Sequence, residues 1–153
     1  MSTARSNNNA IQSQKQNASD KSKSQSQNSG TVTFYSRPGA TKEEVKQIVD
    51  YCAGCNRALK EGQLAPSGRI STKGALRDDA NNAAYRERAA ATSSGKPYSG
   101  VVAHVPDATW SGKANPAQGW MDMSHRVNSS LGAQSGNYPL GYQPTGFFYG
   151  GPK

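Results

Sequence analysis

The first thirty residues contain almost nothing that could join a hydrophobic core, and this limits how much of the chain can fold. They are nearly all Ser, Asn, Gln, Lys and Ala, and Ile11 is the only large aliphatic residue after Met1. Such a segment buries too little apolar surface to offset the entropy of ordering its backbone. We therefore predict a disordered arm or linker at residues 1–30 and a single folded domain at residues 31–153.

The folded part is basic in its own right. The whole chain carries a formal charge of +8, of which residues 1–30, with four Lys or Arg and one Asp, hold +3, which leaves +5 for the remainder. This balance favours a polyanionic partner such as nucleic acid, although a solvated positive surface would have the same composition. No segment has the roughly 18 apolar residues of a membrane span, and the N-terminus lacks the apolar region of a signal peptide.

A reciprocal capping box marks the first predicted helix. The Thr41 side chain can accept a hydrogen bond from the amide of Glu44, whose carboxylate can reach back to the amide of Thr41. Apolar residues then recur at helical spacing as far as Leu59, and Gly62 is a natural stop. We predict a helix over roughly residues 42–61.

An alanine-rich segment predicts a second helix, which follows Ser71 and Thr72 and ends by Gly95. We expect its alanines and Tyr85 to lie on one packed side. A narrow alanine stripe contributes little buried area, so this helix would depend on its neighbours for stability. Its arginines, Arg88 among them, are expected on a solvated face.

The amino-acid composition of the chain changes after residue 96. Pro and Gly recur every few residues, which argues against long helices. Seven of the twelve aromatic residues lie in the final 53 positions, and we expect most of them to pack in the core: Trp110, Trp120, Tyr138, Tyr142, Phe147, Phe148 and Tyr149. The predicted fold class is therefore mainly α, a small single domain with two principal helices and a loop-rich, aromatic-anchored C-terminal third, with an α+β fold as the alternative.

The two cysteines form a CxxC pair, Cys52 and Cys55, within the first predicted helix. A zinc site rich in cysteine is excluded because the chain has no others. A base-deaminase site is disfavoured because Tyr51 stands where that signature has proline, and the chain has no His-x-Glu. We interpret the pair as small buried or half-buried thiols, with a disulfide or redox role as the alternative.

The segment HVPD, residues 104–107, brings a histidine and an aspartate to either side of a proline. Pro106 disfavours the α conformation for Val105, so we predict an extended run at residues 101–105 and a turn or helix start at Pro106. In a fully extended chain, the backbones of His104 and Asp107 would lie about 10 Å apart. A turn would let their side chains converge on one point.

This pair suits phosphodiester hydrolysis. Histidine can take a proton from water near neutral pH, and a carboxylate can hold Mg²⁺ against phosphate oxygens or fix the imidazole tautomer. The alternative is structural: Asp107 would stabilise a helix N-terminus, and His104 would be a half-buried, hydrogen-bonded residue. From the spacing alone, the structural alternative is favoured.

A longer pattern surrounds the pair. The segments GALR, HVPDATW, NPAQGWMDM and RVNSSLGAQSGNYPLGYQPTGFFY follow one another, and together they resemble the polymorphic toxin type 15 domain, a nuclease toxin family named for its HxxD motif. The similarity covers roughly residues 35–150 and extends to DNA-degrading effectors of type VI and related secretion systems. HxxD alone is unspecific, whereas its place between an alanine-rich helix and this tail is much more specific.

The resemblance implies an all-α nuclease that cuts DNA in a metal-dependent and sequence-nonspecific way, with His104 and Asp107 essential. It implies that His104 activates water and that Asp107, with His104, binds a divalent metal such as Mg²⁺, or else Mn²⁺ or Zn²⁺. It also implies secretion by a specialised system or delivery domain into the target-cell cytoplasm. A cognate immunity protein is implied as well, and we expect it to be acidic where it meets the basic cleft.

Further site residues are predicted from their chemistry. Asn128 lies in a polar cluster with Ser129, Ser130 and Gln134 that could position a phosphate or a water, and His125, near Asp122, could supply an acid or a ligand. Three basic residues are the predicted nucleic-acid contacts: Arg69, Lys73 and Arg126. Two other functions stay open, an RNase toxin and a non-catalytic basic module that binds nucleic acid without cutting it.

Overall fold

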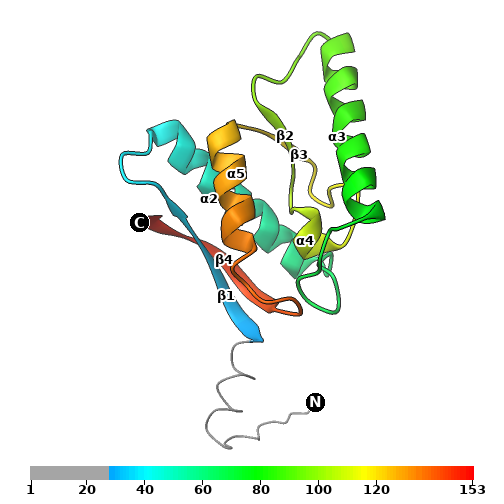
Figure 1. Cartoon of the computed structure of the whole chain (residues 1–153). Helices are drawn as coiled ribbons and strands as arrows, with labels where there is room; N and C mark the ends of the chain where they lie inside the picture. Colours follow the sequence, from blue (N-terminus) through cyan, green and yellow to red (C-terminus); the bar gives the residue numbers. More distant parts are fainter. Residues whose placement is uncertain (1–27) are drawn as a thin grey trace, which may run out of the picture.

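The computed structural model describes residues 28–153 (Figure 1). Four strands and four helices follow one another: β1 (Ser29–Ser36), α2 (Lys42–Lys60), α3 (Ala75–Ser93), β2 (Val101–His104), α4 (Ala108–Ser111), β3 (Trp120–Met123), α5 (His125–Ser135) and β4 (Gln143–Pro152). The arm predicted at residues 1–30 lies almost wholly outside the described residues, and β1 begins within its last two positions.

The fold is α+β, and the prediction of a mainly α domain is wrong. The described residues are 42% helix and 21% strand, in four helices and two small sheets. The last third is not loop-rich, because it holds β3, α5 and the ten-residue strand β4. The glycines of β4 suit its surroundings: a Cβ on Gly150 would lie 2.5 Å from the Tyr35 ring and 2.6 Å from the Thr33 side chain. They therefore permit a tightly packed strand where we expected a loop.

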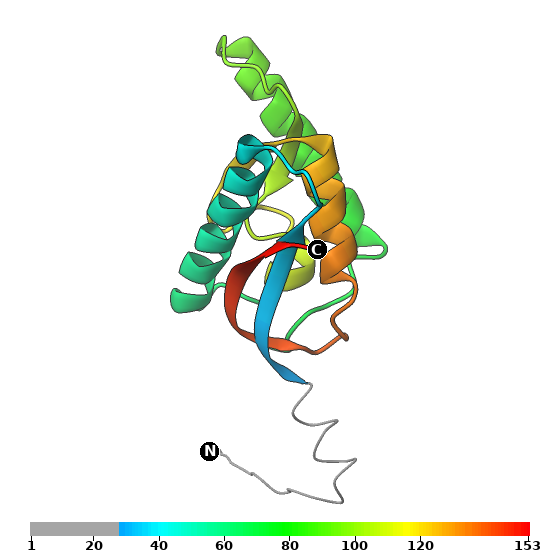
Figure 2. The ribbon, with the colours of Figure 1, turned by 90° about the vertical axis from the view of Figure 1, so that its left-hand side faces the viewer.

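The main sheet joins the two ends of the folded part. β1 and β4 run parallel, with Val32 opposite Phe147 and Phe34 opposite Tyr149. Val32, Phe34 and Ser36 are buried in alternation, as expected for a strand with one face on the core. In Figure 2, α2 lies beside β4 and α5 lies on the β1 side, so the two helices flank the sheet.

Side-chain amides pair with both outer edges of this sheet. On the β1 edge, the Gln134 amide accepts from the backbone N–H of Tyr35 at 2.9 Å and donates to its carbonyl at 3.0 Å. On the β4 edge, Asn56 does the same for Phe147, with both bonds at 2.8 Å. These bonds satisfy backbone groups that an edge strand otherwise leaves free. Gln134 therefore has a structural role rather than a place beside the HVPD segment.

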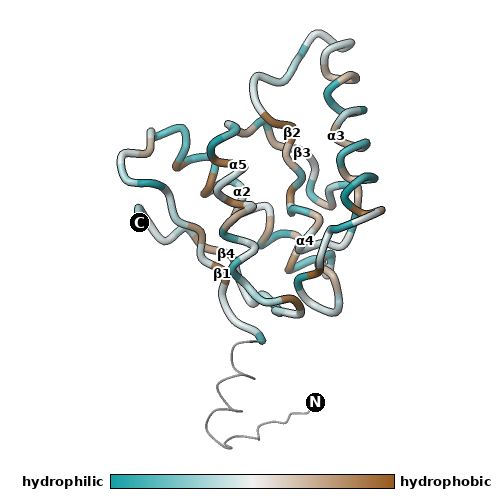
Figure 3. The backbone as a smooth tube through the Cα atoms, viewed as in Figure 1, coloured by the Kyte–Doolittle hydropathy of each residue, from teal (hydrophilic) through white to brown (hydrophobic). Residues whose placement is uncertain are grey.

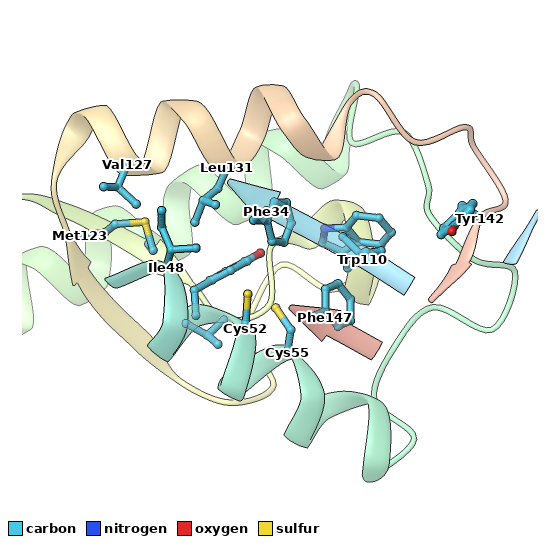
Figure 4. Close-up of a cluster of buried hydrophobic side chains, with 14 residues drawn as sticks. Phe34, Ile48, Cys52, Cys55, Trp110, Met123, Val127, Leu131, Tyr142 and Phe147 are labelled. Carbon is cyan, nitrogen blue, oxygen red and sulfur yellow. The ribbon is translucent and has the colours of Figure 1, made fainter. Parts of the chain in front are cut away.

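The core lies between the sheet, α2 and α5 (Figure 4). Trp110 is fully buried in this core, with its ring 5.4 Å from that of Phe147 in an edge-to-face arrangement. Its indole N–H donates to the Ser135 hydroxyl at 3.1 Å. Tyr142 and Phe147 are also buried, so the expected anchoring by aromatic residues is confirmed for these three.

The α2 helix and its cysteines agree with the sequence. Both halves of the predicted capping box are present, with Glu44 and Thr41 bonded reciprocally. Cys52 and Cys55 are free and buried. Burial raises the pKa of the Cys52 thiol to about 12 and that of Cys55 well above its usual value. The thiols are therefore protonated and unreactive, which confirms their interpretation as packing residues.

The α3 helix stands at the side of the body (Figure 1), and only Ala80 and Ala83 on it are buried. Hydrophilic and hydrophobic residues alternate along α3, whereas the start of the neighbouring β2 is hydrophobic (Figure 3). The expected packing of α3 through its alanines is therefore present, but it involves only a narrow stripe of the helix. Tyr85, which we expected on the packed side, is instead 74% exposed.

Candidate functional site

The HVPD segment forms the corner between β2 and α4. The predicted extended run is confirmed: Val101–His104 form β2, antiparallel to β3, with His104 opposite Trp120. The Val105–Pro106 peptide is cis, both residues are buried, and α4 begins directly after Asp107. The two ends of the corner are thus fixed by a strand pair and by a buried helix.

One nitrogen of His104 is committed to the backbone. Its Nε2 lies 2.9 Å from the carbonyl oxygen of Ala114, and because a carbonyl only accepts, Nε2 carries the proton. The ring also lies against Trp120, with 4.5 Å between centroids. In the neutral ring, Nδ1 then holds the lone pair, and it makes no hydrogen bond within residues 28–153. Nδ1 can therefore take a proton or bind a metal ion, but not both at once.

Asp107 has a structural role and a free oxygen. Its Oδ2 accepts a hydrogen bond from the backbone N–H of Thr109 at 2.9 Å, so Asp107 is the N-cap of α4. This is the helix-stabilising role that the sequence offered as the structural alternative. Asp107 is nevertheless exposed, and Oδ1 makes no hydrogen bond to the described part of the chain. One oxygen thus fixes the carboxylate, and the other is available to a ligand.

Tyr51 supports this corner from α2. Its buried hydroxyl accepts a hydrogen bond from the backbone N–H of Asp107 at 3.1 Å. Burial raises the pKa of the phenol well above its usual value, and the nearby Cys55 and Asp107 add to the shift. Tyr51 therefore stays neutral and contributes a rigid hydrogen bond rather than charge.

His104, Asp107 and Asn128 meet at two adjoining hollows. The larger one, which we call the recess, has a volume of about 320 Å³ and lies between α3 and β2. The smaller inner cavity, of about 80 Å³, extends toward Tyr51 and one face of α5. All three polar side chains line both hollows. The structure thus places the predicted Asn128 with the HVPD pair, on a third element.

The other predicted polar residues lie elsewhere. His125 and Arg126 are exposed at the start of α5 and line neither hollow, and His125 makes only a long contact of 3.5 Å with Ser129. Asp122 accepts from the backbone N–H groups of Ser99 and Gly100 at 2.9 and 2.8 Å. This carboxylate therefore holds a loop.

Two of the predicted basic contacts also lie away from the recess. Arg69 donates to the Tyr138 carbonyl and to the Thr109 hydroxyl, at 2.8 and 2.9 Å, and so ties two loops to α4. Lys73 is exposed in the loop before α3 and lines neither hollow. Neither contributes charge to the walls of the recess.

The sequence reading missed the α3 wall of the recess. Asn81, Tyr85 and Arg88 line it, and their i, i+4, i+7 spacing is that of one helix face. The Arg88 guanidinium donates to the Gly100 carbonyl at 2.8 Å and has no carboxylate partner among the described residues. The spacing was visible in the sequence, but nothing there indicated that this face turns toward His104.

The side chains of the recess fit a divalent cation that has only one or two protein ligands. Within residues 28–153, no three His, Cys, Asp or Glu side chains lie close enough to share a metal ion. A closed structural zinc site is therefore not formed by them. Mg²⁺ commonly binds through one or two carboxylates and keeps its remaining ligands as water and phosphate. Asp107 Oδ1 and the Asn128 amide, whose residues line the same two hollows, suit that mode.

Two helix glycines give a prediction about how the corner is supported. A Cβ on Gly54 in α2 would come 2.3 Å from a Val105 methyl, whereas one on Gly132 in α5 would meet nothing within 4 Å. We expect Gly54→Ala to lower the free energy of unfolding by about 1–3 kcal/mol through overpacking. Gly132→Ala should raise it by about 0.5–1 kcal/mol through helix propensity. Urea unfolding followed by tryptophan fluorescence measures both, and stabilisation by Gly54→Ala would contradict the close packing of α2 on the corner.

No family model matches the chain, and no curated protein or solved structure matches it significantly. The resemblance to the polymorphic toxin type 15 domain therefore stays a prediction. Among residues 28–153, no helix is long and apolar enough to cross a membrane.

Proposed function

We propose that the chain is a nuclease toxin domain that hydrolyses DNA phosphodiester bonds with the help of a divalent cation. The supporting observation is that an imidazole with a free Nδ1, a carboxylate with a free oxygen and an amide, from three different elements, line one recess. The unpaired Arg88 on the same wall adds positive charge. General-base and phosphate-binding groups are thus adjacent, as hydrolysis of a phosphodiester requires.

In this proposal His104 is the general base. Nδ1 takes a proton from a water molecule while the water oxygen attacks phosphorus and the bond to the leaving sugar oxygen breaks. The leaving oxygen is protonated by solvent. The hydrogen bond from Nε2 to the Ala114 carbonyl fixes the tautomer, so the lone pair that accepts the proton is on Nδ1.

The other groups hold the phosphate. Asp107 Oδ1, with Asn128, would bind the cation, which supplies positive charge to the phosphate oxygens when bound. Arg88 can donate to a phosphate through the N–H groups that the Gly100 carbonyl does not use. None of these contacts reads a base, so the proposed cleavage is independent of sequence.

The first test is incubation of the purified chain with supercoiled plasmid in Mg²⁺ or Mn²⁺, with and without EDTA. We expect nicking and then degradation, and loss of both in EDTA, because Asp107 cannot stabilise the phosphate charge without a cation. A parallel incubation with total RNA separates a DNase from an RNase. Retardation of DNA in a gel without breakage would instead support the non-catalytic module.

The biological setting belongs to the same proposal and rests on the resemblance. A toxin of this kind would be delivered by a specialised secretion system into the cytoplasm of a target cell. The producer would need an immunity protein, and an acidic surface would complement the basic folded part. Co-expression with a neighbouring gene product that restores growth tests this.

A further inference from the structure

We propose that Tyr85 makes the recess selective for an unpaired nucleotide, on which its ring stacks beside the reacting phosphate. This inference rests on the proposed function, because it takes the ligand of the recess to be nucleic acid. It concerns a residue that the sequence places in an alanine-rich helix and that the hydrolytic step does not use.

The position of Tyr85 is the first observation. It is a large aromatic side chain, 74% exposed, on a helix whose packed stripe consists of alanine. Tyr85 lines the same recess as His104 and Asp107. An aromatic ring this exposed buries little surface, so packing does not account for its place there. An exposed ring beside a phosphate site is suited to stacking on a base.

The neighbours of Tyr85 on α3 complete a nucleotide-sized site. Arg88 lies about one turn further along the helix and can meet the phosphate, whereas Asn81 lies about one turn earlier and has an amide for a base edge. Val101, Val102 and Ala103 of β2 also line the recess, across from α3. A volume of about 320 Å³ is at the lower end of small-ligand sites, roughly 300–1,000 Å³. The recess can take about one nucleotide, not a duplex.

The selectivity follows from the geometry of stacking. In a duplex, both faces of each base are covered by neighbouring bases, so a protein ring can stack only on a base that has left the helix or was never paired. Single-stranded DNA offers such bases without the cost of opening a duplex. We therefore expect the recess to bind single strands more tightly than the same sequence in duplex form.

The test is a binding measurement that does not require cleavage. The His104→Ala variant, in Mg²⁺, is titrated against a fluorescein-labelled 12-mer of mixed sequence, single-stranded or annealed, and anisotropy gives the two dissociation constants. We expect the single strand to bind at least about tenfold tighter. Adding Tyr85→Ala should weaken single-strand binding by roughly 5-fold to 150-fold and remove the preference, whereas Tyr85→Phe should keep it.

Phe148→Ala is the matched control, because Phe148 is also an exposed aromatic residue, at 51%, and lines neither hollow. It should leave both dissociation constants unchanged. Equal binding of the two DNA forms, or equal weakening of both by Tyr85→Ala, would overturn the inference. Failure of the proposed function would appear separately, as plasmid and circular single-stranded DNA that both stay intact in the presence of Mg²⁺ and Mn²⁺.

Discussion

Replacing His104 by alanine is expected to reduce plasmid cleavage at least about a hundredfold, the scale of losing general-base assistance. The physical reason is the assigned tautomer: Nε2 is bound to the Ala114 carbonyl, which leaves Nδ1 as the only nitrogen able to accept a proton. Initial rates of supercoiled plasmid loss in Mg²⁺ measure the effect. Circular dichroism and tryptophan fluorescence check that the variant keeps its fold.

The chain offers a matched control, because it has only two histidines. His125 is exposed at the start of α5 and lines neither hollow, so His125→Ala should cleave within about twofold of the parent rate. This pair of variants also decides between the two histidines that the sequence nominated. Full activity in a folded His104→Ala protein would end the assignment of the site.

Asp107→Asn is expected to separate the two roles of this aspartate. Asparagine caps helices about as well as aspartate, so the bond to the Thr109 N–H and the stability of the corner should persist. The neutral amide should hold a cation poorly, and because a bound metal contributes several kcal/mol to charge stabilisation, cleavage should fall at least about a hundredfold. Urea unfolding and cleavage rates across a Mn²⁺ titration measure the two roles.

Asp107→Ala is the companion variant, since it removes the cap as well. It should lose about 0.5–2 kcal/mol of unfolding free energy in addition to activity. A fully active Asp107→Asn protein would show that Asp107 serves only as the N-cap of α4, which is the structural alternative raised by the sequence.

Sequence signals that act within a few residues predicted the structure reliably. The capping box at Thr41 and Glu44 located the start of α2, because every group involved lies within one turn. Pro106 likewise indicated the corner after β2, because its ring restricts the residue before it. Asn128 was nominated by its chemistry alone, and the fold of α5 places it beside His104.

Pairings between distant segments could not be read in the same way. The β1–β4 sheet joins residues from the two ends of the folded part, and no local pattern identifies such partners. Gly146 and Gly150 of β4 resembled loop residues, because the sequence does not show that a Cβ at either position would collide with a neighbouring side chain. The sequence nominated Arg69 as a nucleic-acid contact and placed Arg88 on a solvated face, because charge does not reveal which arginine ties down a loop and which lines the recess.

The parallel pairing of β1 with β4 has a mechanical consequence. The chain enters the sheet at Ser29, next to the start of β4, and leaves it at Pro152, next to the end of β1. Tension applied between these two points pulls the strands lengthwise past each other, so the inter-strand bonds share the load instead of opening one by one. A domain tethered at both ends would therefore resist being stretched, and any machine that threads it through a narrow channel would work against this shear.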